Sequence, residues 1–137
     1  MIPRRISVFF YGLFMDAEAL RAQGISPTSP RRGRVQGYSL RIGQRATLIP
    51  DPHGCVYGVL MDLSHNEIER LYAEPSVRVY RPEAVVAELD DGSRVATLCF
   101  NLPEPPGLDE RNDMYAQRLR DLASRLELPV TYVERIG

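Results

Sequence analysis

A carboxylate directly before a proline is the side chain of this sequence best suited to proton transfer. Glu74 stands at the predicted C-terminal end of a helix, before Pro75 and among aromatic and apolar neighbours. A helix C-terminus disfavours an anion by roughly 0.3–1 kcal/mol, so this placement does not serve stability. If it is partly buried, such a carboxyl can take and return a proton near neutrality. The alternative is an ordinary surface glutamate, and the local sequence favours that alternative.

A loop near the start of the chain offers backbone amides as a second candidate site. The apolar run 6–11 ends at Gly12, which predicts a strand buried on both faces. Asp16 is a good N-cap for the helix that follows, and Gly24 stands where a left-handed C-terminal cap falls. Free N–H groups of residues 12–15 can bind carboxylate or phosphate oxygens. The alternative is an ordinary strand-to-helix turn, which the loop alone favours.

The composition excludes several chemistries. All 17 basic residues are arginine, which rules out a Schiff-base lysine and a phosphate-loop lysine. The formal charge of −1 gives no indication of a nucleic acid or an anionic membrane as partner. His53 and His65 share no ligand spacing with each other or with a cysteine, so no metal site is expected. Cys55 and Cys99 lie in apolar runs outside any CxxC pair, which favours buried reduced thiols over a disulfide.

Length and patterning indicate one domain spanning residues 1–137. The N-terminus lacks the order of a signal peptide, and no apolar run reaches the roughly 20 residues that span a bilayer. We therefore expect a cytoplasmic protein without membrane contact. No heptad or long apolar surface stripe is present, so we expect a monomer.

Strand patterns dominate the middle of the chain, and helices lie mostly towards its ends. Such an order predicts an α+β fold with a largely antiparallel or mixed sheet. A capping-box spacing begins one helix at Ser64, and Pro129 either opens a last short helix or precedes an edge strand. The other predicted elements are a loop at 26–34, a strand at 35–42 with a bulge at Gly37, a strand at 46–49, a turn at 50–54, strands at 55–63, 79–89 and 94–100, and an amphipathic helix carrying Tyr115, Leu119, Leu122 and Leu126.

Several segments resemble a known family. Residues 11–15, Tyr-Gly-Leu-Phe-Met, look like the Tyr-Gly-Ser/Thr-Leu loop of the gamma-glutamylcyclotransferase-like superfamily, which includes the avirulence-induced-gene-like proteins. Glu74 stands at the position of the glutamate in the family's L-D-x-x-E segment. The resemblance runs in order over nearly the whole chain. The sequence departs from the pattern in two places, at Leu13 in place of Ser/Thr and at Pro75 in place of glycine. Further similar segments are 34–40, 46–50, 56–63, 71–74, 80–81 and 115–132.

The resemblance implies a small mixed, barrel-like β-sheet flanked by helices, with a pocket between the Tyr11 loop and Glu74. It implies a gamma-glutamyl cyclotransferase, in which the α-amine of a small γ-glutamyl substrate attacks the γ-amide. The products are 5-oxoproline and a free amine or amino acid. Glu74 would be the acid/base, and the reaction would need no metal or organic cofactor. The substrate would contact Tyr11, Gly12, Leu13, Phe14, Tyr80 and Tyr115, with the loops 26–33 and 102–107 beside the leaving group.

Two alternatives remain open at this level. The departures at Leu13 and Pro75 favour a catalytically inactive relative that binds a small carboxylate. A protein that uses the fold only for interaction would be favoured if Glu74 were exposed and no cavity met the Tyr11 loop.

Overall fold

The chain begins with a strand that is buried on both faces, as the apolar run predicts. A computed structural model describes residues 4–137. In strand β1 (Arg5–Phe10), Val8 and Phe10 pack in the cluster between the sheet and the helices. Phe9, between them, points to the opposite side and packs with the residues inside the sheet. Because β1 has two buried faces, its sequence carries no alternation of polar and apolar residues.

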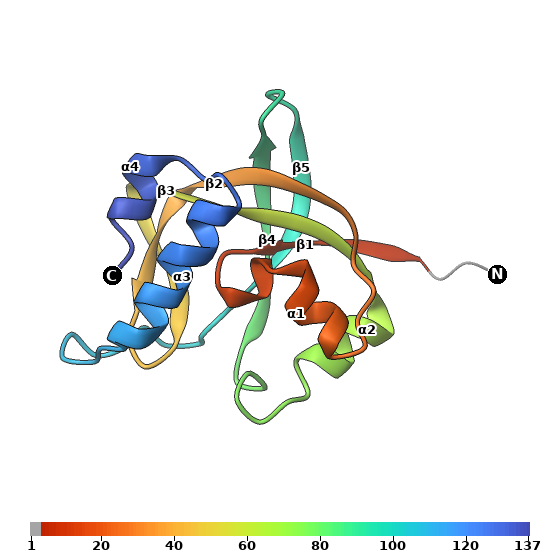
Figure 1. The fold of residues 1–137 in the computed structure, drawn as a ribbon, viewed down its shortest axis with the longest axis horizontal. Coiled ribbons are helices and arrows are strands. Elements are labelled where there is room, and N and C mark those ends of the chain that lie inside the picture. Colours follow the sequence, from red (N-terminus) through yellow and green to blue (C-terminus); the bar gives the residue numbers. More distant parts are fainter. Residues whose placement is uncertain (1–3) are drawn as a thin grey trace.

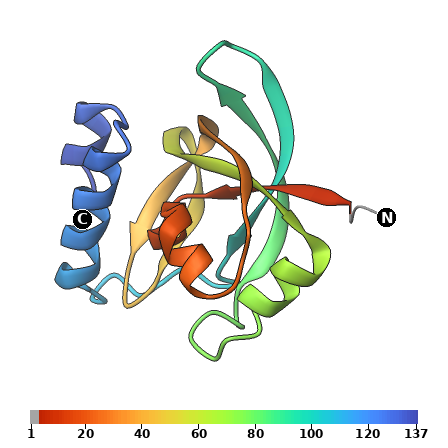
Figure 2. The same cartoon turned by 45° about the vertical axis from the view of Figure 1, so that its right-hand side comes forward.

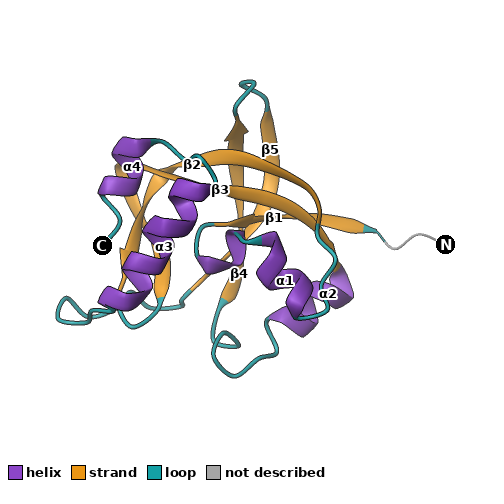
Figure 3. Ribbon diagram, viewed as in Figure 1, coloured by secondary structure: helices purple, strands orange, loops and turns teal. Residues whose placement is uncertain are grey.

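The sheet is a closed barrel of five strands in the order β1-β3-β2-β4-β5 (Figure 3). All neighbouring pairs are antiparallel except β1 with β5. The predicted α+β fold, a small mixed barrel-like sheet flanked by helices, is therefore confirmed. The remaining strands are β2 (Thr28–Ile42), β3 (Ala46–Ser64), β4 (Arg81–Leu89) and β5 (Arg94–Asn101).

Helices cover the barrel on two sides (Figures 1 and 2). One pair, α3 (Asp113–Arg125) and α4 (Val130–Glu134), lies together at the end of the molecule opposite the start of β1. The other pair, α1 (Ala17–Ala22) and α2 (His65–Leu71), lies nearer the start of β1. The alternatives left open at Pro129 are resolved in favour of a helix, since that residue is the N-cap of α4. No helix in residues 4–137 is long and apolar enough to cross a membrane.

The predicted helix caps are confirmed. The Asp16 carboxylate accepts the Glu18 amide at 3.0 Å at the start of α1. Gly24 has a φ of +83° just past the end of that helix, which is the left-handed conformation that glycine adopts without strain. Ser64 and Glu67 form the predicted capping box of α2. Helix α2 nevertheless ends at Leu71, earlier than predicted, so Glu74 lies in the turn beyond it.

Two predicted connections are wrong, because both segments are strand. Much of the predicted loop 26–34 belongs to β2, where Arg31 pairs with Leu60 of β3. The predicted turn 50–54 lies within β3, which is one long strand interrupted by an irregularity opposite the predicted bulge at Gly37. In the first segment, pairing with β3 overrides the local preference of proline and glycine for a loop. In the second, Pro50 pairs with Tyr38 and Cys55 pairs with Gln36, and residues 51–54 between them have no partner in this register.

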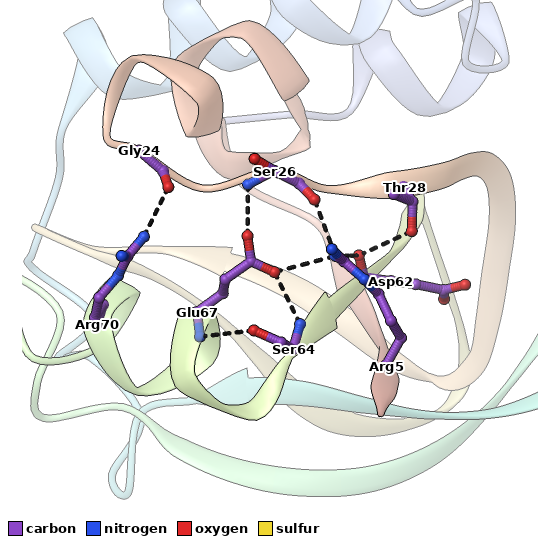
Figure 4. Close-up of polar contacts among 8 residues, drawn as sticks. All are labelled: Arg5, Gly24, Ser26, Thr28, Asp62, Ser64, Glu67 and Arg70. Carbon is purple, nitrogen blue, oxygen red and sulfur yellow. Dashed lines mark hydrogen bonds and ion pairs between the residues drawn. The ribbon is translucent and has the colours of Figure 1, made fainter. Parts of the chain in front are cut away.

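A partly buried carboxylate joins the start of the barrel to α2 (Figure 4). The Glu67 carboxylate accepts the Ser26 amide at 2.6 Å, the Ser64 amide at 2.9 Å and the Arg5 guanidinium at 3.0 Å. Burial opposes ionisation of this carboxyl, but the two amides and Arg5 outweigh it and lower the pKa of Glu67 below its ordinary value. The contacts hold β1, the segment before β2 and the β3–α2 junction in one place.

The core has an inner and an outer part. The inner part fills the barrel with residues that include Phe9, Val56 and Cys99. The outer part lies between the sheet and the helices. Cys55 and Cys99 are both free, as predicted, and burial raises the pKa of the Cys99 thiol to about 12. Cys55 is only partly buried, but burial raises the pKa of its thiol as well, so neither thiol is a ready nucleophile.

Candidate active site

The loop after β1 borders a cavity of about 520 Å³. The other walls come from the β2–β3 turn, the segment that follows α2, and α3. The loop itself contains a short 3₁₀ helix, η1 (Leu13–Met15), between the end of β1 and α1 (Figure 1). The structure places all the residues predicted to bind substrate on the wall of this one cavity: Tyr11, Gly12, Leu13, Phe14, Tyr80 and Tyr115.

Two amides of the loop are free within residues 4–137. The Leu13 amide donates to the Tyr115 hydroxyl at 3.3 Å, and the Met15 amide donates to the Gly12 carbonyl at 3.0 Å. The amides of Gly12 and Phe14 have no hydrogen-bond partner in this part of the chain. The loop can therefore offer these two N–H groups to an oxygen of a ligand in the cavity.

Tyr115 closes tightly over the loop. A Cβ atom at Gly12 would lie 2.5 Å from the Tyr115 hydroxyl oxygen, so only glycine permits this approach. Since that oxygen accepts the Leu13 amide, its own O–H is left to donate. Tyr11, in contrast, is buried and donates its hydroxyl to the Phe100 carbonyl at 2.6 Å, which leaves it a structural role beside the cavity.

Aromatic rings form the floor of the cavity. The Tyr72 ring stacks on Phe100 with centroids 3.9 Å apart, and Phe14 meets Tyr72 edge-on at 6.1 Å. Tyr72 was not among the residues that the sequence predicted to bind substrate, although it lines the cavity. The ring centroids of Tyr80 and Tyr72 lie 6.4 Å apart, and the Tyr80 hydroxyl donates to the Ala46 carbonyl.

The cavity tyrosines are neutral at physiological pH. Burial raises the pKa of the Tyr72, Tyr80 and Tyr115 hydroxyls above the ordinary value of 10.0. They can donate hydrogen bonds but cannot serve as bases near neutrality. Among the described residues, no carboxylate or histidine lines this cavity.

Glu74 stands apart from the predicted binding residues. Its side chain is exposed, so the partial burial that sequence reasoning made a condition for proton transfer is not met in this conformation. Tyr72 and Ser76, on either side of it in the chain, both border the cavity. The predicted leaving-group segments 26–33 and 102–107 do not border it.

The segment that carries Glu74 is a turn held by its own backbone. The Glu74 carbonyl accepts the Val77 amide at 3.0 Å and the Arg78 amide at 2.9 Å. Its carboxylate has no hydrogen-bond or ion-pair partner among residues 4–137. Asp16, the residue directly after η1, uses its carboxylate to cap α1 by accepting the Glu18 amide.

The sequence of the chain matches a known protein family. The model of the family described as "Gamma-glutamyl cyclotransferase, AIG2-like" matches residues 8–119, which include the Tyr11 loop and Glu74. The chain belongs to this family. The match runs from within β1 to the middle of α3, and so includes every residue that lines the cavity. A search of curated proteins gave no significant match.

Several solved structures share the fold of this chain. One described as "Gamma-glutamyl cyclotransferase" has a TM-score of 0.81 at 17% identity and covers 97% of this chain and 86% of its own. An uncharacterized protein from Homo sapiens has a TM-score of 0.80 at 19% identity, covering 96% and 86%. A yeast cyclotransferase described as specific to glutathione has a TM-score of 0.68 at 14% identity, covering 96% and 93%. At these identities the likeness is one of fold.

Proposed function

We propose that the protein is a gamma-glutamyl cyclotransferase that converts a small γ-glutamyl compound to 5-oxoproline and a free amine or amino acid. The observation that carries the proposal is the cavity wall formed by the Tyr11 loop, where Gly12 and Phe14 present free amides beside Tyr115. Membership of the family supports the reaction class.

The free amides suit the α-carboxylate of a γ-glutamyl group. Two N–H donors on one wall can bind its oxygens, and the aromatic floor can cover its methylene chain. Holding the carboxylate and the chain brings the α-amine near the γ-carbonyl and turns ring closure into a reaction between positioned groups. The free O–H of Tyr115 is available to hydrogen-bond the substrate at the same wall.

Ring closure also needs a proton acceptor and donor. The α-nitrogen forms a bond to the γ-carbon, the bond from that carbon to the leaving nitrogen breaks, and one proton moves from the first nitrogen to the second. We assign this transfer to Glu74, the unpartnered carboxylate between the two cavity residues Tyr72 and Ser76. The assignment requires its side chain to turn into the cavity when substrate is bound.

A second candidate function is the binding of a small carboxylate without turnover. The exposed position of Glu74, outside the cavity wall, favours this candidate. The cavity at the Tyr11 loop argues against the third alternative, a protein that uses the fold only for interaction.

The test is 5-oxoproline release from γ-glutamyl dipeptides and γ-glutamylamines by the wild type and Glu74→Gln. We expect turnover to fall by about 10²–10⁴-fold in Glu74→Gln while ligand affinity stays close to that of the wild type. Glu69→Gln is the matched control, because Glu69 is an exposed glutamate on the preceding helix. Equal turnover by wild type and Glu74→Gln would remove Glu74 from the mechanism. Binding without release by the folded wild type would favour the second candidate.

A further inference from the structure

Two arginines stand on the wall of the same cavity. Arg45 ends the turn between β2 and β3, and Arg118 lies on α3 one turn after Tyr115. Each acts on a neighbouring tyrosine: burial raises the pKa of the Tyr80 and Tyr115 hydroxyls, and the charges of Arg45 and Arg118, respectively, oppose that rise. The two positive charges therefore lie close to the polar ends of two different cavity tyrosines.

Neither arginine has an acidic partner within residues 4–137. The ion pairs of the described residues involve other arginines: Arg5, Arg21, Arg31, Arg32, Arg34 and Arg111. Both side chains are exposed, so the two charges lie where the cavity opens to solvent. With no carboxylate on the wall, the cavity has a cationic opening above an aromatic floor.

The segments that carry the two arginines are fastened together. The Gln44 amide donates to the Glu110 carboxylate at 3.3 Å, and the Asn112 side-chain amide donates to the Gln44 carbonyl at 3.1 Å. Asn112 is also the N-cap of α3. The turn that carries Arg45 is thus tied to the start of the helix that carries Arg118, and both residues line the same cavity. Glu110, the acid beside the turn, is occupied by the amides of Gln44 and Gly107.

We propose that Arg45 and Arg118 select γ-glutamyl compounds whose leaving amine carries a carboxylate, and so favour γ-glutamyl amino acids and peptides over γ-glutamylalkylamines. This inference rests on the proposed function. With the α-carboxylate of the γ-glutamyl group at the amides of Gly12 and Phe14, the leaving group extends towards the opening. A carboxylate there meets two guanidinium groups, each able to donate a pair of parallel hydrogen bonds.

The experiment compares γ-glutamylalanine with γ-glutamylethylamide, which differ only in the carboxylate of the leaving amine. We expect kcat/KM of the wild type to be roughly tenfold higher for γ-glutamylalanine, in keeping with two solvent-exposed charge pairs. Arg45→Gln and Arg118→Gln should each reduce this ratio, and the double variant should bring it close to one. Added salt should reduce the ratio for the wild type and leave that of the double variant unchanged. Arg125→Gln, an exposed arginine farther along α3 and outside the cavity wall, is the control.

The outcomes separate the two proposals. Release of 5-oxoproline from both compounds with equal kcat/KM would overturn the role of the arginines and leave the cyclotransferase function standing. Release from neither compound would overturn the proposed function. In that case calorimetry tests the role of the two arginines. Tighter binding of γ-glutamylalanine than of γ-glutamylethylamide, lost in the double variant, would support selection of the carboxylate. Equal binding of the two compounds by the wild type would overturn it.

Discussion

At the scale of single residues, the contact between Gly12 and Tyr115 shapes the candidate site. The Tyr115 hydroxyl receives the Leu13 amide, and its oxygen occupies the space that a Cβ at Gly12 would need. Gly12 has a φ of −110°, which any residue adopts, so the close approach of Tyr115 is the reason for glycine here. The next nearest atom to that Cβ position, Tyr115 Cζ, lies at 3.8 Å, an ordinary contact distance.

We expect Gly12→Ala to lower the free energy of unfolding by about 1–3 kcal/mol, because Tyr115 is packed and must shift. Tyr115→Phe removes the clashing oxygen, so the double variant should lose less stability than the sum of the two single changes. Urea unfolding of all four proteins measures this coupling. Strictly additive losses would show that the contact does not govern the loop.

At the scale of elements, β1 and β3 lie unusually close at Gly58. A Cβ at this position would lie 2.3 Å from the Phe10 carbonyl oxygen and 2.9 Å from Cζ of the Phe9 ring. The nearest atom belongs to the backbone of β1, which is held by its pairing with β3. Because β1 leads directly into the Tyr11 loop, this strand contact also positions the candidate site.

We expect Gly58→Ala to cost about 3 kcal/mol, at the upper end of the range for overpacking, since backbone atoms cannot move aside as a side chain can. The free energy of unfolding from urea titration is the measurement. Val86→Ala is the control: Val86 lies on β4 with 58% of its surface exposed, and its change should stay within about 0.5 kcal/mol. A Gly58→Ala protein as stable as this control would contradict the close approach.

At the scale of the whole molecule, Glu67 connects segments that are far apart in the sequence. Its side chain is 13% exposed and accepts donors from Arg5, Ser26 and Ser64 (Figure 4). These contacts fasten the start of the barrel and the segment after α1 to α2. Because the pKa of Glu67 is lowered in the folded state, the carboxylate stabilises the fold above its unfolded pKa. This stabilisation is lost as the pH falls through the folded pKa.

We expect Glu67→Gln to cost about 1–3 kcal/mol at pH 7, because a neutral amide gives the Arg5 charge no counterion and turns an N–H towards a donor. The difference from wild type should shrink as the pH falls from the ordinary glutamate pKa through the lowered pKa of Glu67, where the wild-type carboxylate becomes protonated. Thermal unfolding at a series of pH values measures it, with Glu69→Gln as the exposed control on the same helix. A difference that does not change with pH would contradict the role of the charge.

Local signals in the sequence predicted local structure correctly. The Asp16 cap, the left-handed Gly24 and the Ser64–Glu67 capping box each depend on atoms a few residues apart, so the sequence contains the whole interaction. The family resemblance, and not a local signal, predicted the barrel-like sheet and predicted that the substrate-binding residues share one pocket. The predicted loop 26–34 failed because pairing with β3 makes much of it strand, and the predicted turn 50–54 lies within β3 at an irregularity of the β2–β3 pairing.

The tertiary structure alone decided which residues line the cavity. It brought Tyr72, Arg45 and Arg118 to one cavity from a helix end, a turn and another helix, although none of the three carries a local signal of function. It also placed Glu74 in the turn beyond α2 with its side chain exposed, where the sequence predicted a helix end. The physical reason is the same in each case. Caps and turns depend on neighbours in the chain, whereas a cavity wall depends on which distant segments pack together.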